Sequence, residues 1–483
     1  MSNLRDKYQV VIGLEVHAQL STNTKAYCSD STVYGSSPNT QTNPISLGHP
    51  GTLPRINAKV IEYAVKMGIA CHSEIREWNE YARKNYFYAD LPKGYQITQD
   101  TTPICNGGYI TIKKEDGSVK KIGITRIHME EDAGKSIHDQ DPFNTLIDLN
   151  RAGVALIEIV SEPDLRSSDE AYKYLVEVRK LVRYLDICDG NLEEGSLRCD
   201  ANISIMPRGS NIFGNRVEVK NMNSLRNVKR AIEHEISRQI EIVENGGKVE
   251  QQTRSFNAGD GSTILMRSKE DANDYRYFPE PDLLPVTVTQ EYIAKVKETL
   301  SPLPNELFEK FTTSFGLSEY DTNVLTEDKE IALYFNTLCS HTNNYKAAAN
   351  FVTGSIKSYL NENAINISDF IINEERMAAL IALVDDGKVS NTIATQKVFT
   401  AMLNNGDSPE EIAKANNWIQ ESDSNALQEW VDTVVAKYPE KVAEYKKGKK
   451  GLIGLFMGEV MKLSKGNADP KLANQLVRET LEK

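Results

Sequence analysis

Aliphatic and polar residues alternate along a short stretch near the start of the chain. Aliphatic residues occupy the even positions from 14 to 20, and Glu15, His17 and Gln19 lie between them. Because successive side chains of a strand point to opposite faces, this alternation predicts a strand with one apolar and one polar face. A carboxylate and an imidazole on one face suit a divalent cation, although a solvated strand face is the simpler interpretation of this stretch alone.

Four later stretches repeat this alternation, at residues 124–130, 154–160, 196–203 and 216–220. Together the five stretches predict a sheet with an aliphatic back and a charged front. Carboxylates on such a front can hold Mg²⁺, and guanidinium and ammonium groups can hold phosphate. The front is therefore either a metal and nucleotide site or a solvated face. Its polar residues after the first strand are Arg126, His128, Glu130, Glu158, Arg198, Asp200, Asn202, Glu218 and Lys220.

Glu158 is the only charged residue of the apolar stretch at residues 154–160. Such a stretch is typical of a strand that is buried on both faces. Burying an unpaired carboxylate is costly, so we expect Glu158 to lie against a cation or strong hydrogen-bond donors.

Helical spacing predicts three helices among these strands. One covers residues 57–69, and a second begins at Ser167, with a predicted capping box to Glu170, and runs to about residue 185. The third is capped by Ser224 and ends at Gly246.

The chain changes character at about residue 289, after which the pattern is helical. Breaks at residues 301–304 and 404–407 divide this part, and Ser408 begins a strongly signalled helix. The predicted helices before Ser408 cover residues 291–300, 305–315, 328–339 and 344–361. We therefore predict three domains, at residues 1–288, 289–405 and 406–483.

Two further stretches, residues 81–95 and 266–282, are dense in polar aromatic residues and are predicted to be binding loops. Such loops can stack an adenine or the terminal bases of an RNA. A loop packed by its own Tyr and Pro residues is an equally good interpretation of the spacing. No Gly-x-x-x-x-Gly-Lys-[Ser/Thr] phosphate loop occurs in the chain.

Composition narrows the class of protein. A chain of 483 residues with 40% hydrophobic and 26% charged residues is typical of a soluble multidomain protein. The six cysteines are scattered, which argues against a disulfide framework. The first residues lack the apolar segment of a signal peptide, and no run of apolar residues approaches membrane-spanning length. We therefore expect a cytoplasmic location. The net charge of −12 argues against a protein coated in nucleic acid but not against a local basic patch.

The motifs at residues 11–17, 83–88, 128–135, 194–200 and 274–282 resemble those of one family, the B subunits of aspartyl/glutamyl-tRNA amidotransferase (the GatB branch of the GatB/GatE family). The resemblance runs along essentially the whole chain. It implies an α+β fold in which a glutamine synthetase-like antiparallel-sheet cradle domain is followed by an all-α helical domain and a small helical YqeY-like tail.

The resemblance also implies a carbon–nitrogen ligase activity. ATP would phosphorylate the side-chain carboxylate of Glu on tRNA(Gln) or of Asp on tRNA(Asn), and ammonia would then displace the phosphate. A separate amidase (A) subunit would release the ammonia from glutamine, and a small C subunit would complete the heterotrimer. Which of the two misacylated tRNAs is used depends on the synthetases of the host.

By the same resemblance, ATP and Mg²⁺ are the expected cofactors on the charged front. The implied metal ligands are Glu15, His17, Glu130, Glu158 and Asp200. Arg198 would clamp phosphate, and the other implied nucleotide-binding residues are Lys220, Arg267 and Arg276. Some relatives carry a Cys-x-Cys and a Cys-x-x-Cys pair after the first strand, and these four cysteines would suit zinc. In this chain Cys28 stands alone in place of the first pair, and residues 43–46 replace the second. No zinc is therefore expected.

Lys84, Glu130 and Arg198 are the implied catalytic residues. Lys84 and Glu130 would lie at the mouth of the ammonia channel, where ammonium must lose a proton before it attacks. The neighbouring Glu131 falls on the opposite strand face unless a bulge intervenes, and its role stays open.

A dense basic turn lies near the end of this acidic chain, at Lys446, Lys447, Lys449 and Lys450. A solvated loop is the usual interpretation of such a run. Two features instead favour binding to tRNA phosphates. Glycines follow the turn at positions 451, 454 and 458, and the segment matches the tail of the family.

Two other classes of function remain open. A noncatalytic tRNA-binding scaffold would not need Glu158 inside an apolar strand. A self-sufficient metallohydrolase, supported only by the Glu and His content, would need no ATP.

Overall fold

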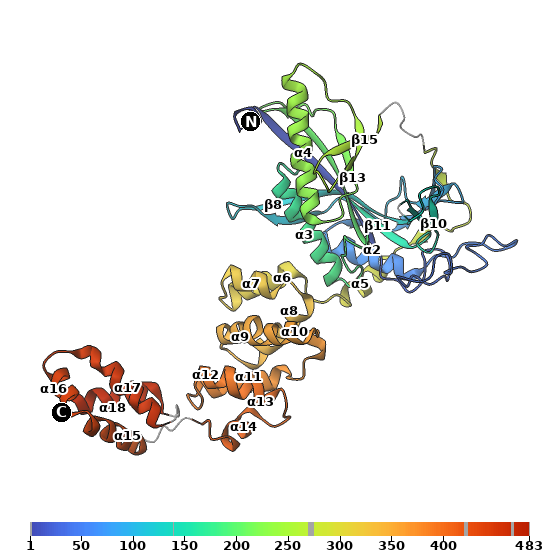
Figure 1. Ribbon diagram of the computed structural model, residues 1–483. Helices are drawn as coiled ribbons and strands as arrows, with labels where there is room; N and C mark the ends of the chain where they lie inside the picture. The colour runs from blue at the N-terminus through green and yellow to red at the C-terminus, as the bar shows by residue number, and fades with distance from the viewer. Residues whose placement is uncertain (1, 139, 269–274, 420–423, 465–467, 483) are drawn as a thin grey trace. The chain divides into compact units, whose positions relative to one another are not determined.

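The computed structural model describes residues 2–138, 140–268, 275–419, 424–464 and 468–482. It forms two compact units, Met1–Leu303 and Pro304–Lys483 (Figure 1). The junction lies in the predicted break at residues 301–304. Among the residues described, no helix is both long enough and apolar enough to cross a membrane.

A ten-stranded sheet forms the frame of the first unit. Its strands follow the order β15-β14-β13-β12-β1-β11-β8-β6-β2, and β7 pairs with β8. Their bounds are β1 Tyr8–Gln19, β2 Glu74–Ile75, β6 Cys105–Asn106, β7 Tyr109–Lys113, β8 Val119–Glu131, β11 Ala155–Ser161, β12 Leu197–Pro207, β13 Val217–Lys220, β14 Gln252–Phe256 and β15 Thr263–Ser268. The five strands predicted from the alternation are neighbours, in the order β13-β12-β1-β11-β8.

The prediction of an antiparallel sheet is correct for these five strands but wrong for one further pair. β13 and β14 run parallel. The helix α4 (Leu225–Glu244) lies between them in sequence, and parallel neighbours need a crossover connection of this kind.

The predicted division into an aliphatic back and a charged front is confirmed. Leu14, Val16 and Ala18 are completely buried, whereas Glu15 and His17 on the opposite face are only partly buried. Helices α2 (Ala58–Ala70), α3 (Ser168–Tyr184) and α4 contribute their apolar stripes to the same core as the aliphatic back (Figure 1). The helices therefore cover the back and leave the front to the polar residues.

The helices α3 and α4 begin at the predicted caps, with one correction, and α2 begins at a cap that was not predicted. Asn57 caps α2 and Ser224 caps α4, which Gly246 follows in a left-handed conformation with φ of 78°. Ser167 accepts a hydrogen bond from the backbone N–H of Glu170, as predicted. The capping box is incomplete, however, because the Glu170 carboxylate accepts from the backbone N–H of Arg166 instead of returning to Ser167.

The two aromatic stretches form a small sheet and are not simply the loops that their spacing predicts. β4 (Ala82–Asn85) pairs with β5 (Tyr95–Thr98) on one side and with β16 (Phe278–Pro279) on the other. The backbone N–H of Asn85 also donates to the carbonyl of Tyr275. Segments almost 200 positions apart are thus joined, although part of the second stretch, residues 269–274, lies outside the described residues.

Short elements complete the first unit, including α5, which packs against α2 and contributes Val296 to the main core. Their bounds are α1 Ser2–Arg5, β3 Trp78–Asn79, β9 Lys135–Ile137, β10 Leu146–Asp148, β17 Val286–Thr287 and α5 Gln290–Glu298. The structure thus places the first predicted helix after residue 288 in the same unit as the sheet.

The second unit is helical, as predicted. Its helices are α6 Pro304–Glu309, α7 Glu319–Leu325, α8 Lys329–His341, α9 Tyr345–Phe351, α10 Lys357–Asn363, α11 Glu374–Asp385, α12 Asn391–Ile393, α13 Phe399–Met402, α14 Pro409–Ala415, α15 Ser424–Lys437, α16 Pro439–Lys446, α17 Ile453–Leu463 and α18 Pro470–Glu482. Short π-helical segments at Lys310–Ser314, Val352–Ile356 and Ala394–Val398 continue α6, α9 and α12, and 3₁₀ turns occur at Ile367–Asp369 and Lys450–Leu452.

The predicted break at residues 404–407 is a turn, and α14 beyond it still packs against α11. Arg376 on α11 donates to the carbonyls of Asn405 and Asp407 and so fixes this turn. Helices α15 to α18 have a core of their own, which includes Leu427, Phe456 and Val477. The division into three domains stays a prediction.

Candidate active site

Three neighbouring strands bring His17, Glu130 and Glu158 together on the charged front. His17 on β1 lies directly opposite Glu158 on β11, and Glu130 comes from β8. His17 Nε2 is 3.4 Å from Glu158 Oε2 and 3.6 Å from Glu130 Oε1. One ligand atom from each of the three side chains lies within 4.8 Å of the others, so these residues can converge on one cation. They form the histidine cluster of the site.

His128 is a fourth member of this group, and it was not among the predicted site residues. It pairs with Glu158 across β8 and β11, and its Nε2 lies 3.3 Å from Glu158 Oε2 and 3.7 Å from Glu130 Oε2. The signal was present, because His128 shares the strand face of Glu130, but one sequence cannot show how closely neighbouring strands pair.

Electrostatics link the four side chains. Burial lowers the pKa of an imidazole, but Glu158 and Glu130 outweigh it and raise the pKa of His128 to about 9. Burial alone would raise the pKa of Glu158, yet His128 and His17 hold it well below its usual range. The expectation that Glu158 lies against a cation or strong donors is therefore met by two imidazoles.

The histidine cluster fits a divalent cation. Against the effect of burial, the imidazoles lower the pKa of both carboxylates and keep them ionised, and His17 can ligate a cation once its imidazole has lost its proton. An imidazole nitrogen and two carboxylates are usual donors for divalent metals in proteins. Glu130 is 3% exposed and also accepts a hydrogen bond from Thr98, so the donors are held by the sheet.

The remaining predicted metal ligands lie in a second group, separate from the histidine cluster, and the ligand assignment stays a prediction. Glu15 and Asp200, which pair across β1 and β12, lie with Glu218 of β13, and one oxygen of each is within 4.8 Å of the others. These three residues are the acidic cluster. Glu218 was missed as a member. Lys220, predicted to bind nucleotide, lies against it, with Nζ 2.5 Å from Asp200 Oδ2 and 2.8 Å from Glu218 Oε1.

Arg198 lies beside the histidine cluster and is held by a buried aspartate. It pairs with His17 across β1 and β12, and its Nη2 is 3.0 Å from Asp132 Oδ2. Arg151 Nε approaches the same oxygen at 3.6 Å. Burial lowers the pKa of Arg198, but Asp132 outweighs it and raises the pKa, so the guanidinium stays charged.

Lys84 lies in a cage of tyrosines next to Glu130. Its Nζ is 4.8 Å from the ring centre of Tyr275 and 5.7 Å from that of Tyr86. Burial lowers the pKa of Lys84, but Glu130 together with Tyr277, Glu158 and Tyr275 outweighs it, so the pKa is raised. Sequence analysis named Lys84 and Glu130 as a pair, and the electrostatic coupling between them agrees with that pairing.

Glu131 points away from this group. No bulge separates it from Glu130, since the register of β8 and β11 shifts only at Val160 and Ser161. Its carboxylate accepts hydrogen bonds from the Lys93 ammonium and from the backbone N–H of Ile97. These contacts give Glu131 a role in fixing β5 against β8.

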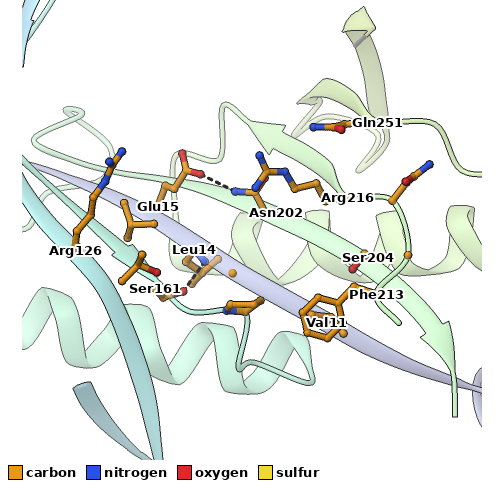
Figure 2. Close-up of a pocket in the computed structure, with 16 residues that line it drawn as sticks. Val11, Leu14, Glu15, Arg126, Ser161, Asn202, Ser204, Phe213, Arg216 and Gln251 are labelled. Carbon is orange, nitrogen blue, oxygen red and sulfur yellow. Dashed lines mark hydrogen bonds between the residues drawn. The ribbon is translucent and has the colours of Figure 1, made fainter. Parts of the chain in front are cut away.

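A pocket of 730 Å³ opens on the charged front beside the acidic cluster (Figure 2). Figure 2 shows Arg126 and Glu15 at one end and Phe213, Arg216 and Gln251 towards the other. The Phe213 ring is about half exposed to the pocket side. Sequence analysis missed Phe213, Arg216 and Gln251 as site residues. Phe213 and Gln251 lie in segments without strand or helix periodicity, and Arg216 was noted only as the first residue of the alternating stretch at 216–220.

The other two predicted nucleotide-binding residues are placed differently from one another. Arg267 on β15 lies near the acidic cluster, where its Nε donates to Thr253 Oγ1 and its charge helps to lower the pKa of Glu218. Arg276 is exposed, with a left-handed φ of 43°, and its carbonyl accepts from Asn85.

The four predicted tRNA-binding lysines are all exposed, at the end of α16 and in the turn that follows. Lys449 pairs with Glu444 at 3.1 Å, and Lys450 lies 3.7 Å from Glu482 and over the ring of Tyr445. Exposed pairs of this kind are weak, so they leave the lysines available to phosphate. An added Cβ at Gly451, Gly454 or Gly458 would meet nothing within 4 Å, so the surface beside the lysines is open.

Comparison with known proteins gives a consistent assignment. The family described as the GatB/GatE catalytic domain matches residues 10–294, and the family described as the GatB domain matches residues 333–481. The chain is 49% identical over 475 residues to the B subunit of the aspartyl/glutamyl-tRNA(Asn/Gln) amidotransferase of Trichlorobacter lovleyi, covering 98% of this chain and 99% of the relative. It is 48% identical to the same subunit of Geobacter sulfurreducens, with coverages of 98% and 99%, and 46% identical to that of Alkalilimnicola ehrlichii, with coverages of 99% and 100%. The chain therefore belongs to the GatB family of amidotransferase B subunits.

Proposed function

We propose that this chain amidates the side-chain carboxylate of Glu on tRNA(Gln), of Asp on tRNA(Asn), or of both, in a reaction driven by ATP. The observation that carries the proposal is the histidine cluster, set on the same sheet face as the pocket of 730 Å³, which Glu15 lines two positions before His17 on β1. In this proposal the pocket takes ATP and the cluster takes Mg²⁺.

The chemistry requires activation because a carboxylate is a poor electrophile. The γ-phosphoryl group passes from ATP to a carboxylate oxygen of the aminoacyl group, and ADP leaves. Ammonia then attacks the carbonyl carbon of this acyl phosphate, the bond from that carbon to the phosphate-bearing oxygen breaks, and phosphate departs with the oxygen. A bound Mg²⁺ ion would offset the negative charge of the phosphates and the incoming carboxylate.

The residues of the front have separate roles in this scheme. His17, Glu130 and Glu158 would hold the metal ion. Arg198, fixed by Asp132, is placed to bind a phosphate through its guanidinium. In the pocket, Phe213 offers an apolar ring for the base, while Arg126 offers charge to the phosphates at the other end.

Lys84 and its tyrosine cage would serve the ammonia step. Ammonium must lose a proton before it can attack, and the nearby Glu130 carboxylate can accept that proton. A separate amidase (A) subunit and a small C subunit are the proposed partners, and the amidase would release ammonia that travels to this site. We also retain the prediction that the sheet is related to the glutamine synthetase core.

The acceptor end of the tRNA would approach over the small sheet that joins the two aromatic stretches. Phe87 is 78% exposed and Tyr88 59% exposed, and both lie between β4 and β5. Exposed aromatic rings stack on unpaired bases. The basic turn at the end of α16 would bind phosphates of the tRNA body.

A noncatalytic scaffold is the alternative. A scaffold would gain nothing from two carboxylates and two imidazoles buried in contact, because desolvating such groups costs several kcal/mol per ion. Such groups concentrate at functional sites, which favours a catalytic subunit.

The two proposals differ in one measurement. The complex of the chain with its partner subunits is given ATP and either misacylated or uncharged tRNA, and phosphate release is followed. A catalytic subunit releases phosphate only with the misacylated tRNA and Mg²⁺. Amide formation without phosphate release would contradict the proposal, and so would release that is indifferent to the aminoacyl group.

A further inference from the structure

The acidic cluster contains a cation that belongs to the chain itself. Lys220 Nζ lies 2.5 Å from Asp200 Oδ2 and 2.8 Å from Glu218 Oε1. All three charged groups stand on the same face of β12 and β13, and Glu15 completes the cluster from β1. An ammonium in this position contacts two of the three carboxylates that converge in the cluster.

The other oxygens of the cluster are held by neutral donors. Asn202 Nδ2 donates to Glu15 Oε1 at 2.8 Å, and Thr253 Oγ1 donates to Glu218 Oε2 at 2.8 Å. Arg267 in turn donates to Thr253 from the adjacent strand. Glu15 and Glu218 are therefore held by contacts that do not depend on Lys220.

We propose that Lys220 is the resident cation of the acidic cluster and takes the place of a metal ion there, so that the chain holds one catalytic metal ion, at the histidine cluster, and not two. The placement of Lys220 as the cation of the acidic cluster is independent of the proposed function. The statement that the one metal ion lies at the histidine cluster rests on that function. Glu15 and Asp200, predicted as ligands of the same ion as His17, would then serve to hold Lys220 beside the pocket.

The physical reason is charge balance. Three carboxylates converging within 4.8 Å repel one another and need a positive charge. A tethered ammonium provides that charge without a metal ion, but it also excludes a second cation by repulsion and by volume. If Lys220 is replaced by an uncharged side chain, three converging carboxylates remain, two of them held by neutral donors, and together they are a donor set for hard divalent cations.

The proposal predicts a gain of metal binding on removing a positive charge. Mn²⁺ binding to the full-length chain, measured by the loss of the free-ion signal in electron paramagnetic resonance, counts the sites. Wild-type chain is expected to bind one Mn²⁺, and Lys220→Met is expected to bind one more. Lys220→Arg, which retains the charge, should keep the wild-type count.

A double variant locates the gained site. Lys220→Met combined with Glu218→Gln should return to the wild-type count, whereas Lys220→Met combined with His17→Ala should lose only the original site. Circular dichroism and the melting temperature identify any variant that fails to fold, and Lys220→Gln is then used in place of Lys220→Met.

Two results would overturn the inference. One is a folded uncharged variant of Lys220 that gains no site. The other is a wild-type chain with two sites, one of which is lost in Glu218→Gln. Failure of the proposed function would look different. If the wild-type chain binds no Mn²⁺ and Lys220→Met binds one, the result refutes a metal ion at the histidine cluster but supports the role of Lys220.

Discussion

His17 on β1 lies directly across from Glu158 on β11, and the imidazole Nε2 is 3.4 Å from the carboxylate oxygen. This contact joins the central strand of the charged front to its neighbour. It explains how a carboxylate can be buried in an otherwise apolar strand, since the two imidazoles of His17 and His128 share its charge. The pair also sets the position of the donors that we assign to the metal ion.

The metal assignment predicts the effect of His17→Ala and Glu130→Gln. Either change should lower ATP-dependent transamidation at least about a hundredfold, because metal and positioned donors carry most of the transition-state stabilisation. The glutaminase activity of the partner subunit should be retained at least in part. Gln19→Ala is the matched control, since Gln19 lies on the same face of β1 beyond the cluster, and it should be close to wild type. Near-normal transamidation by either variant would remove that residue from the site.

Asp132 is expected to act through Arg198. Its carboxylate is buried and lies 3.0 Å from the guanidinium, so Asp132→Asn should leave Arg198 poorly positioned for phosphate and lower kcat/KM for ATP about tenfold or more. The test is a double-mutant cycle: in an Arg198→Ala background the same change should have little further effect. If the fold-losses of kcat/KM in the two single variants multiply in the double variant, Asp132 does not act through Arg198.

Metal binding at the histidine cluster should depend on pH. A ligating imidazole must be neutral, and the carboxylates outweigh burial to raise the pKa of His17 above its ordinary value of 6.5. Protons therefore compete with the metal at higher pH than they would for an ordinary histidine, and affinity rises as pH rises through the raised pKa. Titrations of the chain with Mn²⁺ between pH 6 and 8 should show the affinity increasing by up to about tenfold per pH unit, which corresponds to one proton released. In His17→Ala, the affinity of any residual Mn²⁺ binding should depend less steeply on pH. If the Mn²⁺ affinity of the wild-type chain does not vary with pH, His17 is ruled out as a ligand.

Much of the first unit was predictable from strand periodicity. Five alternating stretches fix which side chains share a face, and the structure confirms each of them. The order and register of strands are long-range properties that one sequence does not contain. For that reason the predicted metal ligands appeared as one set, whereas the register separates His17 and Glu158 from Glu15 and Asp200.

The parts that sequence analysis missed have physical explanations. The parallel pairing of β13 with β14 depends on the crossover through α4, and the Glu170 carboxylate accepts from the backbone N–H of Arg166 and not from that of its cap. Phe213 lines the pocket from an irregular segment, which carries no periodic signal, and Arg216 directly precedes β13. His128 and Glu218 were visible on the charged faces, but only the folded sheet shows what they touch.

The basic turn after α16 should bind tRNA phosphates. Neutralising Lys446, Lys447, Lys449 and Lys450 should raise KM for tRNA and leave turnover at saturating tRNA nearly unchanged. The reason is that contacts to the tRNA body stabilise the bound substrate and the transition state equally. The slope of log affinity against log salt should fall by up to roughly 3–4 units, at about 0.7–0.9 per phosphate contact. Neutralising the exposed Lys295 and Lys297 on α5 is the control. If KM and the salt slope stay unchanged, the turn simply faces water.

The central claim is that the aminoacyl carboxylate is phosphorylated before ammonia attacks it, and oxygen transfer tests that claim most directly. Misacylated tRNA whose side-chain carboxylate carries ¹⁸O is converted by the complex in unlabelled water with ATP and an ammonia source. The phosphate is then analysed by mass spectrometry. An acyl phosphate leaves one labelled oxygen in each phosphate released, in proportion to the amide formed. Amide formation accompanied by wholly unlabelled phosphate would contradict the account.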